Sequence, residues 1–574
     1  MGRKSLRVES VAEAYLALLA ERGVDYLFAN AGTDFPPIVE ALAAAEASGS
    51  PAPKPIIAVH ENLAMSMAHG YAMVSGRIPA VMVHVNVGTA NGICGAINAA
   101  RENVPILFTA GRTPLTEEGL KGSRDAYIHW GQEMYDQAGM LREVVKWDYE
   151  LRNGEQIETV IDRALSIAAT EPAGPVYLTL PREVLAGKLE EISYEQPSRR
   201  VAAAPPRADE AALAEAARIL AAAQSPLILT TNAGRHPEAM AELSAFAARF
   251  AIPVVQFTPR HVSIPSDHEM QLGFNPAPLI EGADAVLVLE SDVPWIPSRV
   301  SPPQVGKVIH IGLDPLFQNT PIRGFLCDLA IEARVGPALR ELSALLERGV
   351  DETRIAARRI RIAPERAALH EGWRRLREQA SGARPIHPAW ISHCIGEAKG
   401  DDTIVVNEYP LMLPHCGFNQ PGRYFGSSSA SGLGWGFGAA LGAKLAAPER
   451  LVIATLGDGA FLFSNPVAAH YAARMHDLPI LTVVFNNSMW NAVRRSTLTM
   501  YPHGSAAKSN KPPLIHLDEL PAFEEVCAAA GGHGERVEDP AELPAALARA
   551  IKVVTQERRQ ALLNVICAAP DGPL

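Results

Sequence analysis

Short apolar runs alternate with helical patterns along almost the whole chain, and this alternation restricts the possible fold more than any other feature. Strands separated by helices pair in parallel through crossover connections, so the pattern predicts α/β domains built on parallel sheets. In the first 185 residues the predicted strands are Tyr26–Phe28, Ile56–Val59, Ala80–Val85, Ile106–Ala110 and 174–181, separated by helices that include Val11–Arg22, Glu61–Val74 and Asn91–Arg101.

The alternation is interrupted twice, and 574 residues are too many for one hydrophobic core. Residues 190–206, rich in Ser, Arg, Pro and Ala, are typical of a linker. The Arg-rich stretch 354–378 indicates a solvated helix that leads out of the second unit. We therefore predict three doubly wound α/β domains with parallel sheets, over residues 1–189, 200–350 and 380–574, of which the first and third share a general plan.

Charge and composition exclude several classes of partner. The net charge of −11 argues against nucleic acid and against a membrane surface, which both favour basic proteins. No apolar run is long enough to span a bilayer, and the charged N-terminus lacks the apolar core of a secretion signal. The six cysteines lack metal-ligand spacing and are best explained as reduced thiols. We expect a cytoplasmic protein.

The strongest chemical signal lies at the ends of two predicted strands. The strand Leu451–Leu456 leads directly into Gly457-Asp458-Gly459, and the strand Ile480–Phe485 leads into Asn486-Asn487. Glycines allow close backbone approach to a phosphate, the following helix offers N–H groups to an anion, and Asp and Asn oxygens suit octahedral Mg²⁺. Either motif alone is usually an ordinary turn. Both at strand ends of one sheet predict a metal–diphosphate site.

The spacing of 26 residues between these motifs resembles the signature of thiamine-diphosphate-dependent enzymes of the acetohydroxyacid synthase, benzoylformate decarboxylase and pyruvate oxidase type. The likeness covers essentially the whole chain and implies a pyrimidine-binding, a central and a diphosphate-binding domain, in that order. It implies that Mg²⁺ is held by Asp458, Asn487 and the carbonyl of Met489. The implied cofactor-binding residues are Glu61, Ser431, Leu433, Gly457, Asp458, Gly459, Ala460, Asn487, Met489 and Trp490, with Leu433 supporting the bent cofactor.

The resemblance also identifies a catalytic carboxylate in the first domain. His60-Glu61, followed by His69-Gly70-Tyr71-Ala72, is similar to the family's His-Glu and Asp-Gly-Tyr-Ala segments. In that family the Glu hydrogen-bonds the aminopyrimidine N1′ and thereby promotes formation of the thiazolium ylid, whereas a Glu at a helix start is otherwise a dipole-complementing residue. We expect the change from Asp to His69 to affect only the helix surface. The family builds each site between two chains, which implies at least a homodimer, commonly a homotetramer.

Three groups of residues bear on the substrate. His84 follows a strand, as a histidine does in benzoylformate decarboxylases, and can relay a proton; an ordinary, partly buried histidine is an equal explanation. Thr33 aligns with a decarboxylase Ser that contacts the substrate carboxylate, although a helix N-cap explains it as well. The turn Asn30-Ala31-Gly32 departs from the family's Gly-x-Pro-Gly. The predicted pocket residues, on a helix over 490–497 that also carries Arg494 and Arg495, are Ala492, Val493 and Ser496.

The central domain resembles those that carry FAD or ADP in relatives, but its first strand leads into 230–235 with only one glycine, so we predict no FAD. The favoured function is non-oxidative cleavage or formation of a C–C bond, as in a decarboxylase or carboligase, on a small 2-oxo acid or an acyloin (2-hydroxy ketone). Two alternatives remain: acetolactate synthase, and a 2-hydroxyacyl-CoA lyase or oxalyl-CoA-type decarboxylase. A non-catalytic scaffold is a further possibility that the presence of Glu61 argues against.

Overall fold

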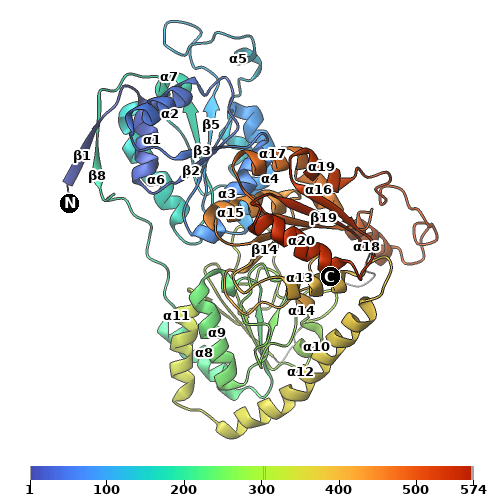
Figure 1. The fold of residues 1–574 in the computed structure, drawn as a ribbon. Helices are drawn as coiled ribbons and strands as arrows, with labels where there is room; N and C mark the ends of the chain where they lie inside the picture. Colours follow the sequence, from blue (N-terminus) through green and yellow to red (C-terminus); the bar gives the residue numbers. More distant parts are fainter. Residues whose placement is uncertain (1, 302, 304–305, 570–574) are drawn as a thin grey trace.

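The computed structural model describes residues 2–301, 303 and 306–569 and contains three parallel sheets, one in each predicted domain range. Met1 and residues 570–574, which the predicted ranges include, lie outside the described residues. In Figure 1 the first domain (blue) and the third (orange to red) lie side by side, and the central domain (green to yellow) lies below them. The prediction of three α/β domains with parallel sheets is confirmed.

The first domain has a six-stranded sheet in the order β3-β2-β4-β5-β7-β6. Its strands are β2 (Tyr26–Ala29), β3 (Lys54–Ile57), β4 (Ala80–Val83), β5 (Leu107–Arg112), β6 (Asp148–Glu150) and β7 (Val176–Pro181). Its helices are α1 (Val11–Glu21), α2 (Pro36–Ser48), α3 (Glu61–Ser75), α4 (Val85–Arg101), α5 (Ile128–Gly131), α6 (Ile157–Ala169) and α7 (Arg182–Leu185). The chain passes from β2 outward to β3 and returns to β4 on the other side of β2. The topological switch point, where such sheets bind ligands, therefore lies between the carboxyl ends of β2 and β4.

The third domain repeats this strand order, as β15-β14-β16-β17-β19-β18. Its strands are β14 (Ile404–Glu408), β15 (Tyr424–Gly426), β16 (Val452–Gly457), β17 (Leu481–Asn486), β18 (His533–Val537) and β19 (Ala561–Ile566). Its helices are α13 (Pro388–Ala398), α14 (Leu413–Cys416), α15 (Trp435–Ala446), α16 (Asp458–Phe463), α17 (Pro466–Met475), α18 (Asn491–Met500), α19 (Phe523–Ala529) and α20 (Leu543–Thr555). The shared plan predicted for the first and third units is thus visible strand by strand, and the second switch point lies between β14 and β16.

The central domain has a five-stranded sheet in the order β10-β9-β11-β12-β13. Its strands are β9 (Pro226–Thr230), β10 (Val254–Gln256), β11 (Ala285–Leu289), β12 (Lys307–Gly312) and β13 (Leu329–Glu332), and its helices are α8 (Glu210–Ala222), α9 (Pro237–Phe250), α10 (Ala277–Ile280) and α11 (Val335–Glu347). The Arg-rich stretch forms α12 (Glu352–Ala380), as predicted. It is not solvated throughout, because Arg358 is buried and donates to the terminal carbonyls of Leu220 and Phe250.

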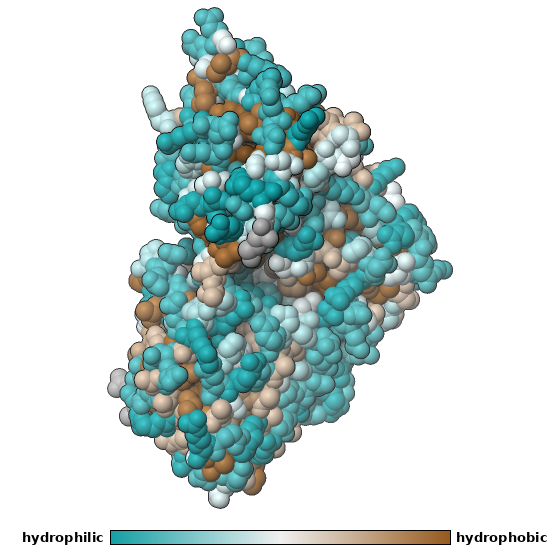
Figure 2. Space-filling view, turned by 90° about the vertical axis from the view of Figure 1, so that its left-hand side faces the viewer, coloured by the Kyte–Doolittle hydropathy of each residue, from teal (hydrophilic) through white to brown (hydrophobic). Residues whose placement is uncertain are grey.

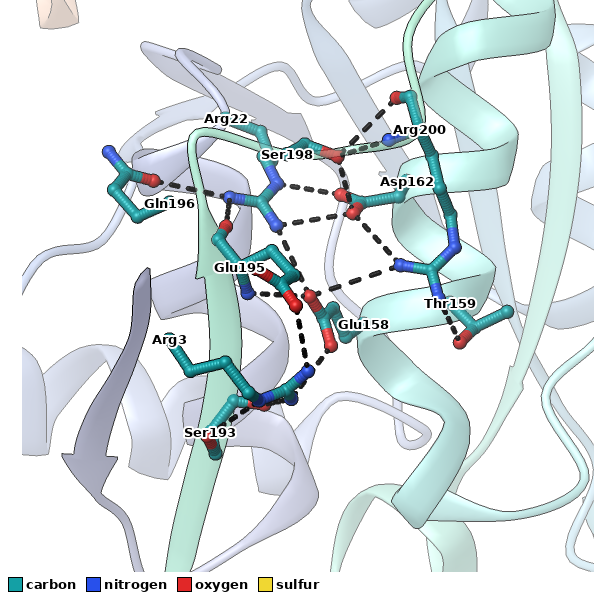
Figure 3. Close-up of polar contacts among 10 residues, drawn as sticks. All are labelled: Arg3, Arg22, Glu158, Thr159, Asp162, Ser193, Glu195, Gln196, Ser198 and Arg200. Carbon is teal, nitrogen blue, oxygen red and sulfur yellow. Dashed lines mark hydrogen bonds and ion pairs between the residues drawn. The ribbon is translucent and has the colours of Figure 1, made fainter. Parts of the chain in front are cut away.

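The predicted linker at 190–206 begins later than the sequence indicates. Residues 191–196 form β8, which pairs antiparallel with β1 (Gly2–Arg7). Figure 3 shows how the start of the linker is fastened: the Arg22 guanidinium bonds both oxygens of Asp162, at 2.6 and 3.2 Å, and the carbonyl of Glu195 at 2.9 Å. The Ser198 hydroxyl donates to the same Asp162. β1 is polar and exposed. β8 alternates the buried Ile192 and Tyr194 with polar residues, a short pattern that the linker prediction missed.

Helices α3 and α15 join the first and third domains face to face. They occupy equivalent places, after β3 and after β15, and each presents small residues to the other. A Cβ at Gly70 would overlap the Ala439 carbonyl, and one at Gly442 would overlap the Met67 carbonyl. Glycine therefore allows the two backbones to approach closely, which fixes Glu61, the first residue of α3, relative to the third domain.

The face with β1, β8, α1 and α6, turned toward the viewer in Figure 2, is mainly hydrophilic and narrows between the upper and lower domains. Among the described residues, no helix has the length and apolar character needed to cross a membrane.

Candidate active site

The carboxylate of Asp458 lies at the carboxyl end of β16, where α16 begins, and is 3% exposed. Its Oδ1 accepts the Gly459 N–H at 2.7 Å, and its Oδ2 accepts the Asn487 N–H at 3.1 Å from the end of β17. Burial raises the pKa of Asp458, and the surrounding N–H groups oppose this rise. Such a buried carboxylate, held by neutral donors alone, suits a cation as its counter-charge.

The turn after β17 presents the second predicted metal ligand. Asn487 Oδ1 accepts the Met489 N–H at 3.1 Å, and Ser488 between them has a φ of 55°, a left-handed conformation. Asn486 instead points into the domain and donates to Asn564 Oδ1 at 3.1 Å. The structure thus brings Asp458, Asn487 and Met489 to neighbouring strand ends. Their role as metal ligands stays a prediction.

The predicted diphosphate-binding residues surround the same edge. A Cβ at Gly457 would meet open space, whereas one at Gly459 would overlap the indole ring of Trp490. Gly457 therefore leaves room beside Asp458, and Gly459 lets Trp490 cover the start of α16, next to Ala460. A hard-oxygen donor set with space beside it fits a divalent ion and a diphosphate. Among the described residues no group of three or more His, Cys, Asp or Glu could hold a metal, consistent with a site that uses only one carboxylate.

The loop before α15 carries Leu433, which is half-buried between two closely packed glycines. A Cβ at Gly432 would crowd Cys94 and Asn98 of α4, and one at Gly434, whose φ is 86°, would overlap the Phe463 carbonyl. The Asn98 Nδ2 donates to the Gly432 carbonyl at 2.9 Å, and its Oδ1 accepts the Gly432 N–H at 3.1 Å. Ser431 has a φ of 53°. The loop is thus fixed between the first and third domains.

A buried acid, Glu408, holds the other end of this loop. Its Oε1 accepts the Gly434 N–H at 2.8 Å, and its Oε2 accepts the Gly436 N–H at 2.6 Å. Burial raises the pKa of Glu408 to about 7, although these N–H donors favour the charged form. Glu408 ends β14, so it lies at the switch point of the third domain.

Glu61 is the first residue of α3 and is 6% exposed. The helix starts here because His60 is the N-cap and its Nδ1 accepts the Asn62 N–H at 3.1 Å. Asn30 Nδ2 donates to Glu61 Oε1 at 2.9 Å, and Asn91 Nδ2 donates to Oε2 at 3.0 Å. These two hydrogen bonds fix the position of the Glu61 carboxylate.

His84 lies at the end of β4 and is 17% exposed. Its Nδ1 is 2.6 Å from Asp34 Oδ1, and its Nε2 is 3.2 Å from Gln132 Nε2. Thr33 is exposed beside Asp34, and its carbonyl accepts from Arg182 at 3.1 Å. The N-cap explanation for Thr33 is wrong, because α2 begins at Pro36 with Phe35 as its N-cap. The structure thus brings Thr33 and His84 to one switch point.

His69 differs from the expectation that it lies on the helix surface. It is 1% exposed, its ring lies 5.4 Å from the Trp435 ring, and burial lowers its pKa to about 3. The residue therefore packs in the α3–α15 contact as a neutral ring, because that face of α3 is covered by the third domain.

The predicted pocket residues Ala492, Val493 and Ser496 lie on exposed positions of α18, which begins at Asn491. They do not line an enclosed cavity within the described part of this chain. Their role in the substrate pocket stays a prediction.

Sequence reasoning missed the partners that orient the predicted groups: Asn30, Asn91, Asp34, Gln132 and Glu408. Only Asn30 gave a signal, because it belongs to the turn Asn30-Ala31-Gly32, which departs from the family's Gly-x-Pro-Gly. The others are ordinary polar residues whose importance depends on neighbours far away in the chain.

Three domain models of the thiamine pyrophosphate enzymes match the chain: the N-terminal binding domain over residues 9–140, the central domain over 213–342 and the C-terminal binding domain over 408–565. The chain is 27% identical to sulfoacetaldehyde acetyltransferase of Alcaligenes xylosoxydans xylosoxydans, over 98% of this chain and 93% of that protein. It is 25% identical to benzoylformate decarboxylase of Pseudomonas aeruginosa, over 85% of this chain and 88% of that protein. Thiamine diphosphate-dependent 4-hydroxybenzoylformate decarboxylase of Rhodococcus jostii RHA1 has a similar fold, with a TM-score of 0.78 and 21% identity over 98% and 100% of the two chains.

Proposed function

Because the chain belongs to the thiamine pyrophosphate (thiamine diphosphate) enzyme family, we propose that it is a Mg²⁺-dependent enzyme that breaks or forms a C–C bond of a 2-oxo acid or 2-hydroxy ketone without net oxidation. The observation that carries this proposal is the pair of strand ends at β16 and β17, where the buried Asp458 meets Asn487. His84, half-buried at the switch point of the first domain, supports the non-oxidative reaction because it can exchange protons with substrate.

In this proposal each of the predicted site residues has a separate role at the bound cofactor. Asp458, Asn487 and the Met489 carbonyl would hold Mg²⁺ and through it the diphosphate, and Leu433 would support the ring system. Bound thiamine diphosphate supplies a carbon nucleophile that then stores the electrons of the broken bond. Glu61, held by Asn30 and Asn91, would hold a proton at its carboxylate against the aminopyrimidine. His84 would give and take a proton at the substrate oxygen.

The predicted absence of FAD remains part of this proposal and rests on the single glycine in the segment 230–235 after β9. The Arg323 guanidinium lies 4.7 Å from the Phe317 ring and 5.1 Å from the Phe325 ring, and donates to the Ser291 carbonyl at 3.2 Å. The Glu290 carboxylate accepts the Leu313 N–H at 2.7 Å. These contacts border a small pocket at the carboxyl ends of β11 and β12, lined by Glu290, Ser291, Asp314 and Phe317.

We also propose that the working unit is a homodimer at least. Val467, Tyr471 and Met475 repeat every four residues along α17 and are 73%, 48% and 45% exposed. Val59 and Val87, close in sequence to Glu61 and His84, are each 46% exposed. These apolar residues suit an interface with a second copy, which would close the site. The six free cysteines support the cytoplasmic location as part of the same proposal.

Sulfoacetaldehyde acetyltransferase activity is a second candidate, because the matching relative of that name aligns with 98% of this chain. Acetolactate synthase and 2-hydroxyacyl-CoA lyase or oxalyl-CoA decarboxylase are further alternatives.

The test is an activity panel with purified protein, Mg²⁺ and thiamine diphosphate. Release of CO₂ from a 2-oxo acid, or cleavage or synthesis of a 2-hydroxy ketone, is the expected result, and it should vanish with EDTA and in Asp458→Ala. Acetolactate formation with a bound yellow flavin, turnover of an acyl-CoA, or turnover of sulfoacetaldehyde alone would each replace the proposal by the corresponding alternative. No turnover of any substrate by fully loaded protein would contradict it.

A further inference from the structure

The switch point of the first domain holds a carboxylate–histidine pair. Asp34 follows β2 and His84 directly follows β4, and these strands are neighbours in the sheet although β3 lies between them in the chain. Asp34 is 3% exposed, and His84 is 17% exposed. This place in domain one corresponds to the Glu408–Asp458 edge in domain three, where the cofactor site is proposed.

The backbone around the pair leaves space for it. A Cβ at Gly32 would overlap the His84 ring, and a Cβ at Gly111 would overlap the Asp34 carboxylate. Neither glycine has a positive φ, so conformational freedom does not explain their presence. Glycine is needed at both positions because the side chains of His84 and Asp34 fill the space.

The hydrogen bonds define the tautomer of His84. A carboxylate only accepts, so the 2.6 Å contact with Asp34 Oδ1 requires the proton on His84 Nδ1. The Nε2 of the neutral ring then carries a lone pair and accepts from the Gln132 amide at 3.2 Å. Nε2, and not Nδ1, is therefore the atom that can take up a proton.

Gln132 can also serve the protonated ring. Its Oε1 is buried and makes no hydrogen bond among the described residues. Rotation of the amide by half a turn would place Oε1 where it accepts from Nε2–H. The same side chain can thus contact both protonation states of His84, and the Asp34 carboxylate compensates the positive charge of the second.

We infer that Asp34 is a positioning residue that keeps His84 in the tautomer protonated on Nδ1, so that Nε2 exchanges a proton with the substrate. The inference rests on the proposed function. In the cleavage of a 2-hydroxy ketone, Nε2 takes the proton from the substrate hydroxyl, which leaves an imidazolium beside the Asp34 carboxylate. It returns one proton to the product, so the histidine ends neutral and no other reactant is needed.

Asp34 also has a structural role, which the test must separate. Its Oδ2 accepts the Val85 N–H at 3.2 Å and so caps the start of α4. In Asp34→Asn the remaining oxygen can keep this cap, while the new NH₂ group faces Nδ1 and favours the opposite tautomer. The substitution therefore changes the proton position on His84 and retains the helix cap.

The experiment measures kcat, KM and thiamine diphosphate affinity of the loaded enzyme for Asp34→Asn, His84→Ala and the double variant. Asp34→Asn should lower kcat at least about 10-fold with unchanged cofactor affinity, as for other residues that orient a functional histidine. Asp34 acts only through His84 in this proposal, so the double variant should be no slower than His84→Ala alone. Unchanged kcat in Asp34→Asn, or losses that multiply in the double variant, would overturn the inference. Asp401→Asn, an exposed aspartate in the third domain, is the matched control.

A spectroscopic measurement keeps this test distinct from that of the proposed function. In ¹⁵N-histidine NMR spectra, the signal that disappears in His84→Gln should show a proton on Nδ1, and in Asp34→Asn a proton on Nε2. A wild-type His84 protonated on Nε2 alone would overturn the inference even in an active enzyme. If the expected tautomers are observed but the loaded enzyme turns over no substrate, the role of Asp34 in setting the His84 tautomer stands. The proposed function is then rejected.

Discussion

At the scale of single residues, the carboxylate of Glu61 is restrained at both oxygens by amides from two other segments. Asn30 comes from the turn after β2 and Asn91 from the second turn of α4. Asn30 therefore has a physical role in this turn, since a residue without a side-chain amide would remove one donor to Glu61. A carboxylate fixed in this way loses little orientational freedom when it meets a ligand.

Removal of one donor should therefore lower turnover. A hydrogen bond to a charged group contributes about 1.5–3 kcal/mol, so Asn91→Ala should reduce kcat about 10-fold or more. Steady-state kinetics with saturating cofactor measures the effect, and Asn319→Ala, at an exposed position of the central domain, is the control. An Asn91→Ala enzyme as fast as wild type would show that Asn30 alone suffices.

The sequence predicted the site residues that belong to motifs. It did not predict the residues whose hydrogen bonds orient those site residues. Asp458 and Asn487 follow strands that apolar runs identify, and the structure places both at neighbouring strand ends. Asp34 and Gln132 reach His84 from 50 and 48 residues away, and no local pattern marks such a pair. His69 was misplaced because one face of α3 is covered by α15, a contact that the sequence of α3 alone does not reveal.

At the scale of elements, the loop before α15 depends on one buried acid. Glu408 binds the N–H groups of Gly434 and Gly436, next to Tyr409 and Ser431, whose φ values are 85° and 53°. The loop geometry is therefore coupled to the protonation state of Glu408. Burial, which disfavours the carboxylate, is the main cause of its raised pKa, and the neighbouring Cys94 thiol also has a raised pKa.

This raised pKa predicts a pH dependence of stability. The pKa of Glu408 rises from 4.5 to about 7 on folding, so the native state binds the proton more tightly than the unfolded state. The resulting stabilisation is complete below about pH 4.5 and is lost as pH rises through about 7, a change of about 3 kcal/mol. Urea unfolding midpoints of wild type should therefore fall relative to those of Glu408→Gln between pH 5 and about 8. A constant difference between the urea midpoints of the two proteins over this pH range would contradict the raised pKa of Glu408.

Among the elements, apolar strands were predictable, including the short β2, whereas β1 and β8 were not. The central strands β5, β7, β16 and β17 are buried and appear as apolar runs in the sequence. β1 was missed because it is polar and exposed, and β8 was assigned to a linker because its apolar alternation is limited to the buried Ile192 and Tyr194. The predicted strand Ala80–Val85 ends at Val83, because the carboxylate of Asp34 caps α4 at Val85.

At the scale of the whole molecule, the three domains meet at one buried ionic cluster. Arg260 of the central domain lies 2.8 Å from Glu102 of the first domain and 3.2 Å from Asp292 of its own. The Ser429 N–H of the third domain donates to Glu102 at 3.3 Å. Ser429 belongs to the loop that carries Leu433, so this loop is connected to all three domains through the cluster.

The proposed dimer predicts a specific effect of a charge on α17. Val467→Glu should convert the protein to monomers and lower its activity on dilution, because burial of an unpaired carboxylate at an apolar interface is unfavourable. Sedimentation velocity gives the mass of the particle. Ile360→Glu, on α12 and equally exposed at 76%, should leave it unchanged. A Val467→Glu protein with the same mass as wild type would reject α17 as the interface.

We propose that Glu61 activates a cofactor held at Asp458 and Asn487. The most direct measurement is the rate at which the C2 proton of bound thiamine diphosphate exchanges with deuterium, in wild type and in Glu61→Gln. We expect Glu61→Gln to bind Mg²⁺ and thiamine diphosphate as wild type does but to exchange this proton orders of magnitude more slowly, with a corresponding loss of turnover. Equal exchange rates in the two proteins would contradict it.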